Sequence, residues 1–187
     1  VALAGSVCYR GLGTVEFLLA PDGRFYFLEM NTRLQVEHPV TECVTGLDLV
    51  RWQLEIAAAG RLLLAQDGIT RSGHAIEARV YAEDPARNFL PQAGRAVRVR
   101  WPEGPPVRVD TGIASGDDVP VHYDPILAKV IAVGETRAEA LERLTLALDE
   151  SVVHGVVTNL PFLRALVRAH AVRRAEVDTE WIEREFL

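Results

Sequence analysis

Two acidic residues flank a tight turn near the start of the chain, and their spacing is suited to binding a cation. Glu16 precedes Pro21-Asp22-Gly23, Glu29 follows it, and apolar residues dominate both flanks. Asp-Gly between apolar runs predicts a β-hairpin with strands at residues 14–20 and 24–30. A two-residue turn at Asp22-Gly23 then places Glu16 directly opposite Glu29.

Carboxylates in facing positions repel each other, and a divalent cation with oxygen ligands is a natural means of holding them together. Their apolar flanks raise the cost of leaving them unpaired. The polar series continues as Asn31, Arg33, Gln35 and Glu37, and these side chains share one face if the backbone stays extended. The same alternation is typical of any half-solvated strand, so the pattern alone leaves both interpretations open.

The elements that must position these residues are predicted from periodicity and capping signals. A helix is expected from about His38 to Gly46, and another over residues 47–59 with Gly60 as its end. Beyond them, short β-rich runs between Gly, Pro and Asp predict a small, mostly antiparallel sheet with strands at residues 75–81, 96–101, 107–110 and 127–133.

Helices are predicted after this sheet. Thr136 and Glu139 form a capping box for an amphipathic helix through Glu150, with an apolar stripe of leucines at 141, 144 and 148. A second helix is expected over residues 160–169, and a short last one from about residue 179. Together the patterns predict an α+β fold.

Composition excludes several classes of function. The 187 residues carry a net charge of −6 with scattered basic residues, which argues against a nucleic-acid surface. The apolar runs are too short to span a bilayer, and we find no basic amphipathic segment and no signal peptide. Cys8 and Cys43 are expected to be buried thiols of a cytoplasmic protein. Because the first residue is Val1, we expect the chain to belong to a longer protein.

Four ordered motifs resemble those of the biotin carboxylases within the ATP-grasp superfamily. The first is Glu29-Met30-Asn31-Thr32-Arg33, continued by Gln35-Val36-Glu37-His38-Pro39-Val40-Thr41-Glu42. The others are Glu77-Ala78-Arg79-Val80-Tyr81-Ala82-Glu83-Asp84-Pro85, then His122-Tyr123-Asp124-Pro125 with Lys129, and GVVTNLPFL at residues 155–163. The resemblance covers nearly the whole chain.

The resemblance implies a role for each residue of the first motif. Glu16 and Glu29 match the carboxylates that hold Mg²⁺ (or Mn²⁺) on the phosphates of ATP, with Asn31 beside them. The bicarbonate pocket is implied to consist of Arg33, Gln35 and the backbone of Val36. An arginine suits this planar anion because its guanidinium forms a fork of donors.

The resemblance also implies a general base and a residue that acts on biotin. Glu37 matches the base that takes a proton from bicarbonate, and Arg79 matches the arginine that stabilises the biotin enolate. Taken alone, Arg79 in a strand with Glu77 favours a surface ion pair, and only the presence of the first motif favours the functional role. His38 is interpreted as a helix-start or core histidine. Tyr123 and Asp124 lie near the biotin pocket and subunit contact in the family, or form a plain turn.

The implied organisation is the end of an ATP-grasp domain at residues 1–70 and a biotin carboxylase C-terminal domain at residues 71–187. The ATP-gripping lysines and glycine-rich lid are expected upstream, so the chain alone is expected to be inactive. The expected partners are a biotin carboxyl carrier domain, a carboxyltransferase subunit and a second copy in a homodimer. Lys129, the single lysine, lies in an apolar run and is not expected to be the carrier's biotinylated residue.

Two alternatives remain open. Another ATP-grasp ligase, such as a carbamoyl-phosphate synthetase, would share the Glu16/Glu29 pair but has no reason to carry the residues from Arg33 to Pro39 and then Arg79. The chain by itself is alternatively a folding and dimerisation module without catalytic activity.

Overall fold

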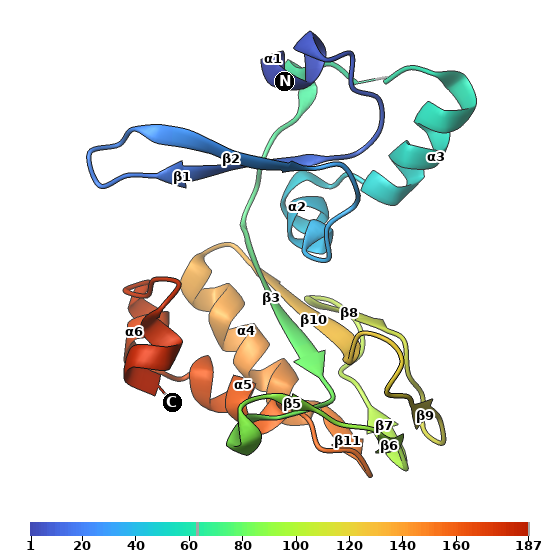
Figure 1. Cartoon of the computed structure of the whole chain (residues 1–187), viewed down its shortest axis with the longest axis vertical. Helices are drawn as coiled ribbons and strands as arrows, with labels where there is room; N and C mark the ends of the chain where they lie inside the picture. The colour runs from blue at the N-terminus through green and yellow to red at the C-terminus, as the bar shows by residue number, and fades with distance from the viewer. Residues whose placement is uncertain (63, 187) are drawn as a thin grey trace. The chain divides into compact units, whose positions relative to one another are not determined.

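A computed structural model describes residues 1–62 and 64–186 of the chain. The chain divides into two compact units, Val1–Ser72 and Gly73–Leu187. The first contains the β-hairpin and three helices, and the second contains the larger sheet with its covering helices (Figure 1). The mixture of helices and antiparallel sheets confirms the predicted α+β class.

The hairpin of the first unit pairs β1 (Thr14–Leu19) with β2 (Phe25–Asn31). Glu16 faces Glu29 as predicted, although the turn differs from the one assumed. Ala20 pairs with Arg24 around three residues, Pro21 to Gly23, and Gly23 adopts a positive φ of 81°. The ladder then shifts register after Glu16, and this β-bulge restores the Glu16–Glu29 pairing.

The strand ends at Asn31, so the assumption of an extended backbone as far as Glu37 was wrong. Arg33 lies in a bend and Glu37 in a turn at the start of α2 (His38–Thr45). Pro39 follows in the first turn, where its missing N–H costs nothing. The polar residues after Asn31 therefore reach their positions through a folded loop instead of a strand face.

The other helices of the first unit are α1 (Ala2–Ser6) and α3 (Leu49–Ala59), with a 3₁₀ turn at Gln66–Gly68. Gly46 and Gly60 end α2 and α3 in the left-handed conformation, as expected of helix-terminating glycines. Glu42, 8% exposed, accepts a hydrogen bond from the backbone N–H of Leu49 at 2.8 Å. This buried carboxylate joins the two helices, which the sequence patterns did not reveal.

The central sheet of the second unit has the order β3–β10–β8 and is antiparallel throughout. Its strands are β3 (His74–Tyr81), β10 (Ile126–Gly134) and β8 (Val107–Thr111). Three of the four predicted strands correspond to them within a few residues. The fourth prediction, residues 96–101, corresponds to the shorter β7 (Arg98–Arg100), which pairs with β11 (Val152–His154).

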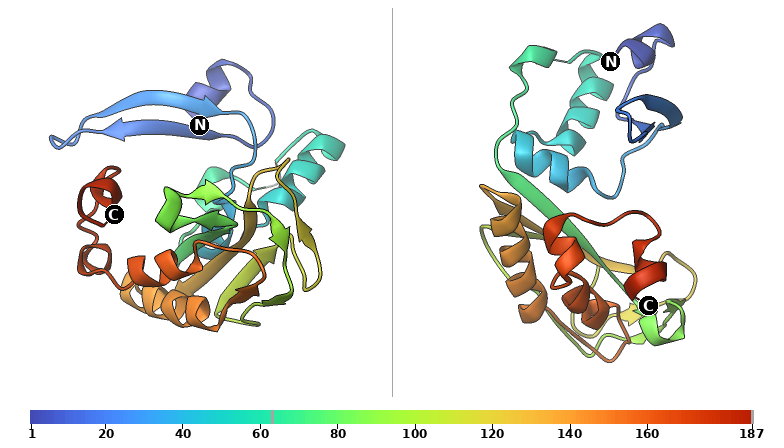
Figure 2. Two further views of the ribbon diagram at one scale, coloured as in Figure 1. Left: turned by 60° about the horizontal axis from the view of Figure 1, so that its bottom comes forward. Right: turned by 90° about the vertical axis from the view of Figure 1, so that its left-hand side faces the viewer.

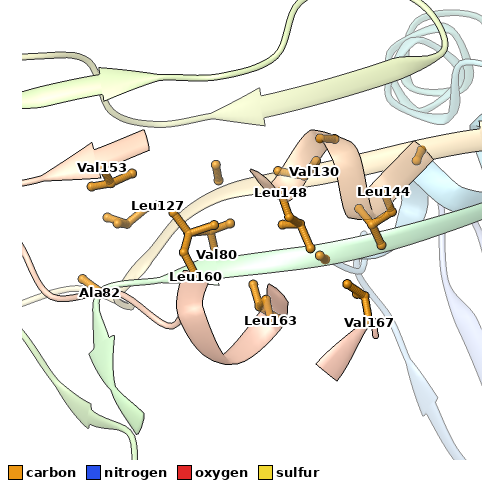
Figure 3. Close-up of a cluster of buried hydrophobic side chains, with 14 of the residues drawn as sticks. Val80, Ala82, Leu127, Val130, Leu144, Leu148, Val153, Leu160, Leu163 and Val167 are labelled. Atoms are coloured by element: carbon orange, nitrogen blue, oxygen red, sulfur yellow. The ribbon is translucent and has the colours of Figure 1, made fainter. Parts of the chain in front are cut away.

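The core lies between this sheet and α4 (Arg137–Glu150) (Figures 1 and 3). Thr136 caps α4 by accepting a hydrogen bond from the Glu139 N–H, and this confirms the predicted helix start. Leu144 and Leu148 are at most 1% exposed and belong to the same buried cluster as residues of β3 and β10, among them Val80 and Val130. Burial of these aliphatic side chains is the main source of stability in this unit.

Shorter elements surround the core. α5 (Leu160–Leu166) packs beside α4, as the second view of Figure 2 shows, and is followed by α6 (His170–Arg174) and a π-helical turn at Ile182–Phe186. The predictions missed α6 as a separate helix. Two further short ladders pair β4 (Glu83–Asp84) with β5 (Leu90–Pro91), and β6 (Gly94–Arg95) with β9 (Asp118–Val119); a 3₁₀ turn spans Pro85–Arg87.

Two expectations about surface and membrane properties can be compared with the structure. Cys8 is exposed and Cys43 is only half-buried, so the expectation that both thiols are buried was wrong. Cys8 lies just after the short α1, where few side chains surround it. Within residues 1–62 and 64–186, none of the helices has the length and apolar character needed to cross a bilayer.

An ion cluster crosses the central sheet from β8 to β10. The Asp110 carboxylate accepts hydrogen bonds from the Arg108 guanidinium at 2.8 and 2.9 Å, and lies 3.1 Å from Lys129 Nζ. Partial burial raises the cost of ionising Asp110, but the bonds from Arg108 and Lys129 outweigh it and hold its pKa below the ordinary 3.8. The Lys129 side chain is only 13% exposed, which disfavours it as the lysine that carries biotin.

Because its pKa is lowered in the folded state, ionised Asp110 stabilises the fold above pH 3.8, and this contribution is lost as the pH falls through the lowered pKa. We expect Asp110→Asn to lower the free energy of unfolding at pH 7 by about 1–3 kcal/mol, since Arg108 and Lys129 lose a charged acceptor. Urea titrations of the chain would measure this, with the exposed Glu176→Gln as control at under about 0.5 kcal/mol. A difference between wild type and Asp110→Asn that persists undiminished in acid would contradict the assignment.

Candidate functional site

The two facing carboxylates of the hairpin are joined by an amide. Asn31 Nδ2 donates hydrogen bonds to Glu16 Oε1 at 2.7 Å and to Glu29 Oε1 at 3.1 Å. Gln35 Nε2 donates to the same Glu16 oxygen at 2.9 Å. The structure thus brings four of the predicted residues into one hydrogen-bonded group, and the amide donors offset the repulsion between the carboxylates.

The surroundings of this group differ from the expectation of an apolar setting. Phe17, Phe25, Phe27 and Leu28 are all exposed by 48% or more, so they do not enclose the carboxylates. Glu29 is itself exposed, while Glu16 is half-buried. The argument that burial forces the pair to find a cation was therefore wrong, and what remains is the mutual repulsion of facing carboxylates.

The remaining residues of the first motif lie along the loop that follows. Arg33 donates to the Leu34 carbonyl at 3.2 Å and to Asn31 Oδ1 at 3.5 Å, which links its guanidinium to the acidic group. Val36 and Glu37 form the turn before α2, and the Glu37 side chain is exposed and makes no capping bond to the helix. His38 opens α2, and its ring Nδ1 lies 2.8 Å from the Gln35 carbonyl oxygen. This agrees with a helix-start histidine.

The donor set of the hairpin fits a magnesium ion. Mg²⁺ in proteins takes one or two carboxylates and completes its shell with water and substrate phosphates. Glu16 and Glu29 supply the carboxylates, and the Asn31 amide carries an oxygen of the same hard type. In the described part of the chain there is no cluster of three or more His, Cys, Asp or Glu side chains suited to a metal.

Arg79 belongs to the second unit, on β3. Its guanidinium carbon lies 5.2 Å from the centre of the Tyr81 ring, and its Nη2 donates to the Tyr81 hydroxyl. Residues 79 and 81 point to the same face of the strand, which places the ring under the guanidinium. The contacts that the structure describes for the Arg79 guanidinium are with Tyr81. Sequence reasoning missed Tyr81, although its spacing of two from Arg79 was the available signal.

Two carboxylates, Glu83 and Asp124, interact electrostatically with the pair formed by Arg79 and Tyr81. Burial raises the pKa of Glu83, the charge of Asp124 raises it further, and Arg79 lowers it. Burial also raises the pKa of Tyr81, Arg79 opposes this, and Asp124 adds to it. Asp124 Oδ1 accepts a hydrogen bond from the Ile126 N–H at 3.0 Å, across Pro125. The second and third motifs therefore meet around Arg79.

Comparison with known proteins matches a family to a part of each unit. Residues 77–184 match the family described as the biotin carboxylase C-terminal domain. Residues 1–65 match the family described as the ATP-binding domain of the carbamoyl-phosphate synthase L chain.

The chain is 48% identical over 184 residues to the mitochondrial propionyl-CoA carboxylase alpha chain of Mus musculus, covering 97% of this chain and 25% of that protein. It is also 48% identical over 185 residues to the mitochondrial methylcrotonoyl-CoA carboxylase subunit alpha of Rattus norvegicus, covering 97% and 26%. The chain thus spans about a quarter of the length of these relatives.

Solved structures are similar over the same extent. The biotin carboxylase domain of a thermophilic 2-oxoglutarate carboxylase bound to bicarbonate matches with a TM-score of 0.94 at 38% identity, covering 97% of this chain and 41% of that one. The biotin carboxylase subunit of pyruvate carboxylase matches with a TM-score of 0.94 at 40% identity, covering 97% and 40%. The match to the biotin carboxylase C-terminal domain covers more than half of the chain, and the chain therefore belongs to the biotin carboxylase family.

Proposed function

We propose that this chain is part of an enzyme that carboxylates biotin on a carrier protein, using bicarbonate and ATP. The observation that carries the proposal is the hydrogen-bonded group of Glu16, Glu29, Asn31 and Gln35, followed by Arg33 on the same loop. Similar solved domains are described as bound to bicarbonate, and to MgADP together with bicarbonate. The family and these ligands fit the chemistry of the group.

Each residue has a task in this reaction. Glu16, Glu29 and Asn31 would hold Mg²⁺, which neutralises charge on the phosphates of ATP while bicarbonate attacks the terminal one. Arg33, Gln35 and the backbone of Val36 would bind bicarbonate. This attack would release ADP and form carboxyphosphate, which would divide into CO₂ and phosphate. The ureido nitrogen of biotin would give its proton to the released phosphate and attack CO₂.

Glu37 would accept a proton in these steps, and Arg79 would stabilise a developing negative charge. Glu37 is exposed at the start of α2, where its carboxylate is accessible to accept the proton of bicarbonate. The Arg79 guanidinium would stabilise the negative charge that develops on the ureido oxygen of biotin.

The proposed organisation assigns residues 1–70 to the end of an ATP-grasp domain and residues 71–187 to the C-terminal domain. The partners would be a biotin carboxyl carrier domain, a carboxyltransferase subunit and a second copy of the enzyme. The lysines and glycine-rich lid that grip ATP would be supplied by other parts of the full-length enzyme. The chain alone is therefore expected to be inactive.

A carbamoyl-phosphate synthetase-like ligase is the second candidate, because residues 1–65 match a family described by that name. Residues 77–184, however, match the biotin carboxylase family, and Arg79 lies within them. A nitrogen donor such as ammonia should then leave the rate of ADP release unchanged, whereas free biotin should raise it.

Replacing the proposed base tests this assignment. In the full-length enzyme we expect Glu37→Gln to lower bicarbonate- and biotin-dependent ADP release about 100-fold, because the amide cannot accept the proton. The measurement is a coupled ADP assay with MgATP, bicarbonate and free biotin. Glu55→Gln on α3, an exposed residue paired with Arg51, serves as the matched control and should retain the wild-type rate. A Glu37→Gln enzyme with normal turnover would show that the base has been misplaced.

A further inference from the structure

The fourth sequence motif has no place in the proposed chemistry, yet its asparagine contacts the strand that carries Arg79. Asn159 is only 6% exposed and lies about 80 residues further along the chain. Its Oδ1 accepts a hydrogen bond from the Tyr81 N–H at 2.9 Å, and its Nδ2 donates to the Arg79 carbonyl at 3.1 Å. Its own backbone N–H donates to the Tyr81 carbonyl at 3.1 Å.

These bonds hold the backbone on both sides of Val80. An amide side chain that accepts from one residue and donates to another two positions earlier imitates the edge of a neighbouring β-strand. The side-chain directions of Arg79 and Tyr81 follow from the backbone to which they are attached. Fixing these two peptide groups therefore fixes the positions from which the side chains of Arg79 and Tyr81 extend.

The position of Asn159 indicates that the amide is diverted from a more usual use. Asn159 is the N-cap residue of α5, where an asparagine side chain normally accepts a hydrogen bond from the first turn. Here the side chain makes no capping bond. The second helical residue is Pro161, which has no N–H to offer. The amide is thus free to bind β3.

We propose that Asn159 is a positioning residue for Arg79, acting through the backbone of β3 and the Tyr81 ring. The proposal rests on the proposed role of Arg79 toward biotin and deepens it. Tyr81 completes the arrangement, because its ring lies under the guanidinium and its hydroxyl accepts from Nη2. The side-chain bonds described for Asn159 go to the backbone of Arg79 and Tyr81 and not to the guanidinium.

A residue that only supports the fold would affect every step of catalysis alike, whereas a residue that positions Arg79 affects the steps that need Arg79. ADP release in bicarbonate without biotin reports formation of carboxyphosphate, and the added release on giving free biotin reports the later steps. The ratio of the two rates is therefore the diagnostic quantity, because a general loss of folded enzyme cancels from it.

The experiment uses the full-length enzyme with Asn159→Asp and Asn159→Ala. Asn159→Asp keeps an oxygen that accepts from the Tyr81 N–H but places a second oxygen against the Arg79 carbonyl. Asn159→Ala removes the side-chain hydrogen bonds to both residues. We expect each to lower the stimulation by free biotin about tenfold. Ser151→Ala is the control, since Ser151 is also buried and its Oγ donates to the Ala147 carbonyl at 2.7 Å, away from Arg79. It should leave the stimulation unchanged.

A double-mutant cycle with Arg79→Gln decides whether Asn159 acts through Arg79. If it does, Asn159→Asp should change the stimulation less than twofold once Arg79 is glutamine. The same tenfold loss in both backgrounds, an equal fall of the biotin-free and biotin-stimulated rates, or failure of both Asn159 variants to fold would overturn the proposal. Wild-type stimulation in Arg79→Gln alone would instead refute the role proposed for Arg79.

Discussion

Glu29→Gln is expected to reduce ATP turnover by the full-length enzyme about 1,000-fold while leaving the hairpin at least as stable as before. The loss of turnover follows because one of the two carboxylates proposed to hold Mg²⁺ is gone, and a bound cation contributes several kcal/mol to a phosphoryl-transfer transition state. The stability is retained because Glu29 faces Glu16, and like charges in that position destabilise a strand pair by a few tenths of a kcal/mol or more.

The prediction is specific because ATP turnover is expected to fall while the stability of the hairpin is expected to stay the same or rise. ADP release over a range of Mg²⁺ concentrations measures the first effect, and hydrogen exchange of the β1–β2 amides measures the second. Glu55→Gln, whose carboxylate lies on α3, should change neither quantity. A large loss of amide protection in Glu29→Gln would mean that Asn31 needs both carboxylates for structure, and that the activity loss reports unfolding instead of cation binding.

Gly155→Ala is expected to lower the free energy of unfolding by about 3–5 kcal/mol, the largest stability effect that we foresee. Gly155 has a φ of +98°, and an added Cβ would lie 2.2 Å from the Arg95 carbonyl oxygen and 2.9 Å from the Val97 nitrogen. These are backbone atoms of a neighbouring segment, so they cannot move aside as a flexible side chain would. Urea unfolding of the chain, followed by circular dichroism, would measure the loss.

Gly116 offers a matched control, because its φ of +97° is nearly the same. An added Cβ there would meet only the end of the Arg95 side chain, at 3.9 Å. Gly116→Ala should therefore cost only the strain of the left-handed conformation, about 1–2 kcal/mol. Equal costs at the two glycines would show that the close approach at Gly155 is relieved by a small backbone shift.

The sequence predicted what depends on neighbours along the chain. The α4 start at Thr136, the ends of α2 and α3 at Gly46 and Gly60, and the strands of the central sheet all follow from local capping, left-handed glycines and alternation. These signals act over a few residues, so they are visible without the fold. The motifs that indicate the biotin carboxylase family were likewise readable as short strings.

The hairpin shows how a local prediction can be correct for an incorrect reason. Glu16 was placed opposite Glu29 by assuming a two-residue turn, but the turn has three residues and a β-bulge compensates for the difference. The bulge follows Glu16 in the ladder, and no residue type in this stretch marks it in advance. The assumption of an extended backbone beyond Asn31 failed because the chain turns before α2.

Only the tertiary structure decided which distant residues meet. Asn159 lies 78 residues from Tyr81, Asp124 acts on the group around Arg79 from another strand end, and Glu42 joins α2 to α3 by a buried carboxylate. Hydrogen bonds and charges of this kind depend on distances in space, and neither periodicity nor spacing encodes those distances. The sequence by itself determined the family and most of the elements and proposed the candidate residues, whereas the contact between Asn159 and β3 that holds the backbone of Arg79 was decided by the tertiary structure.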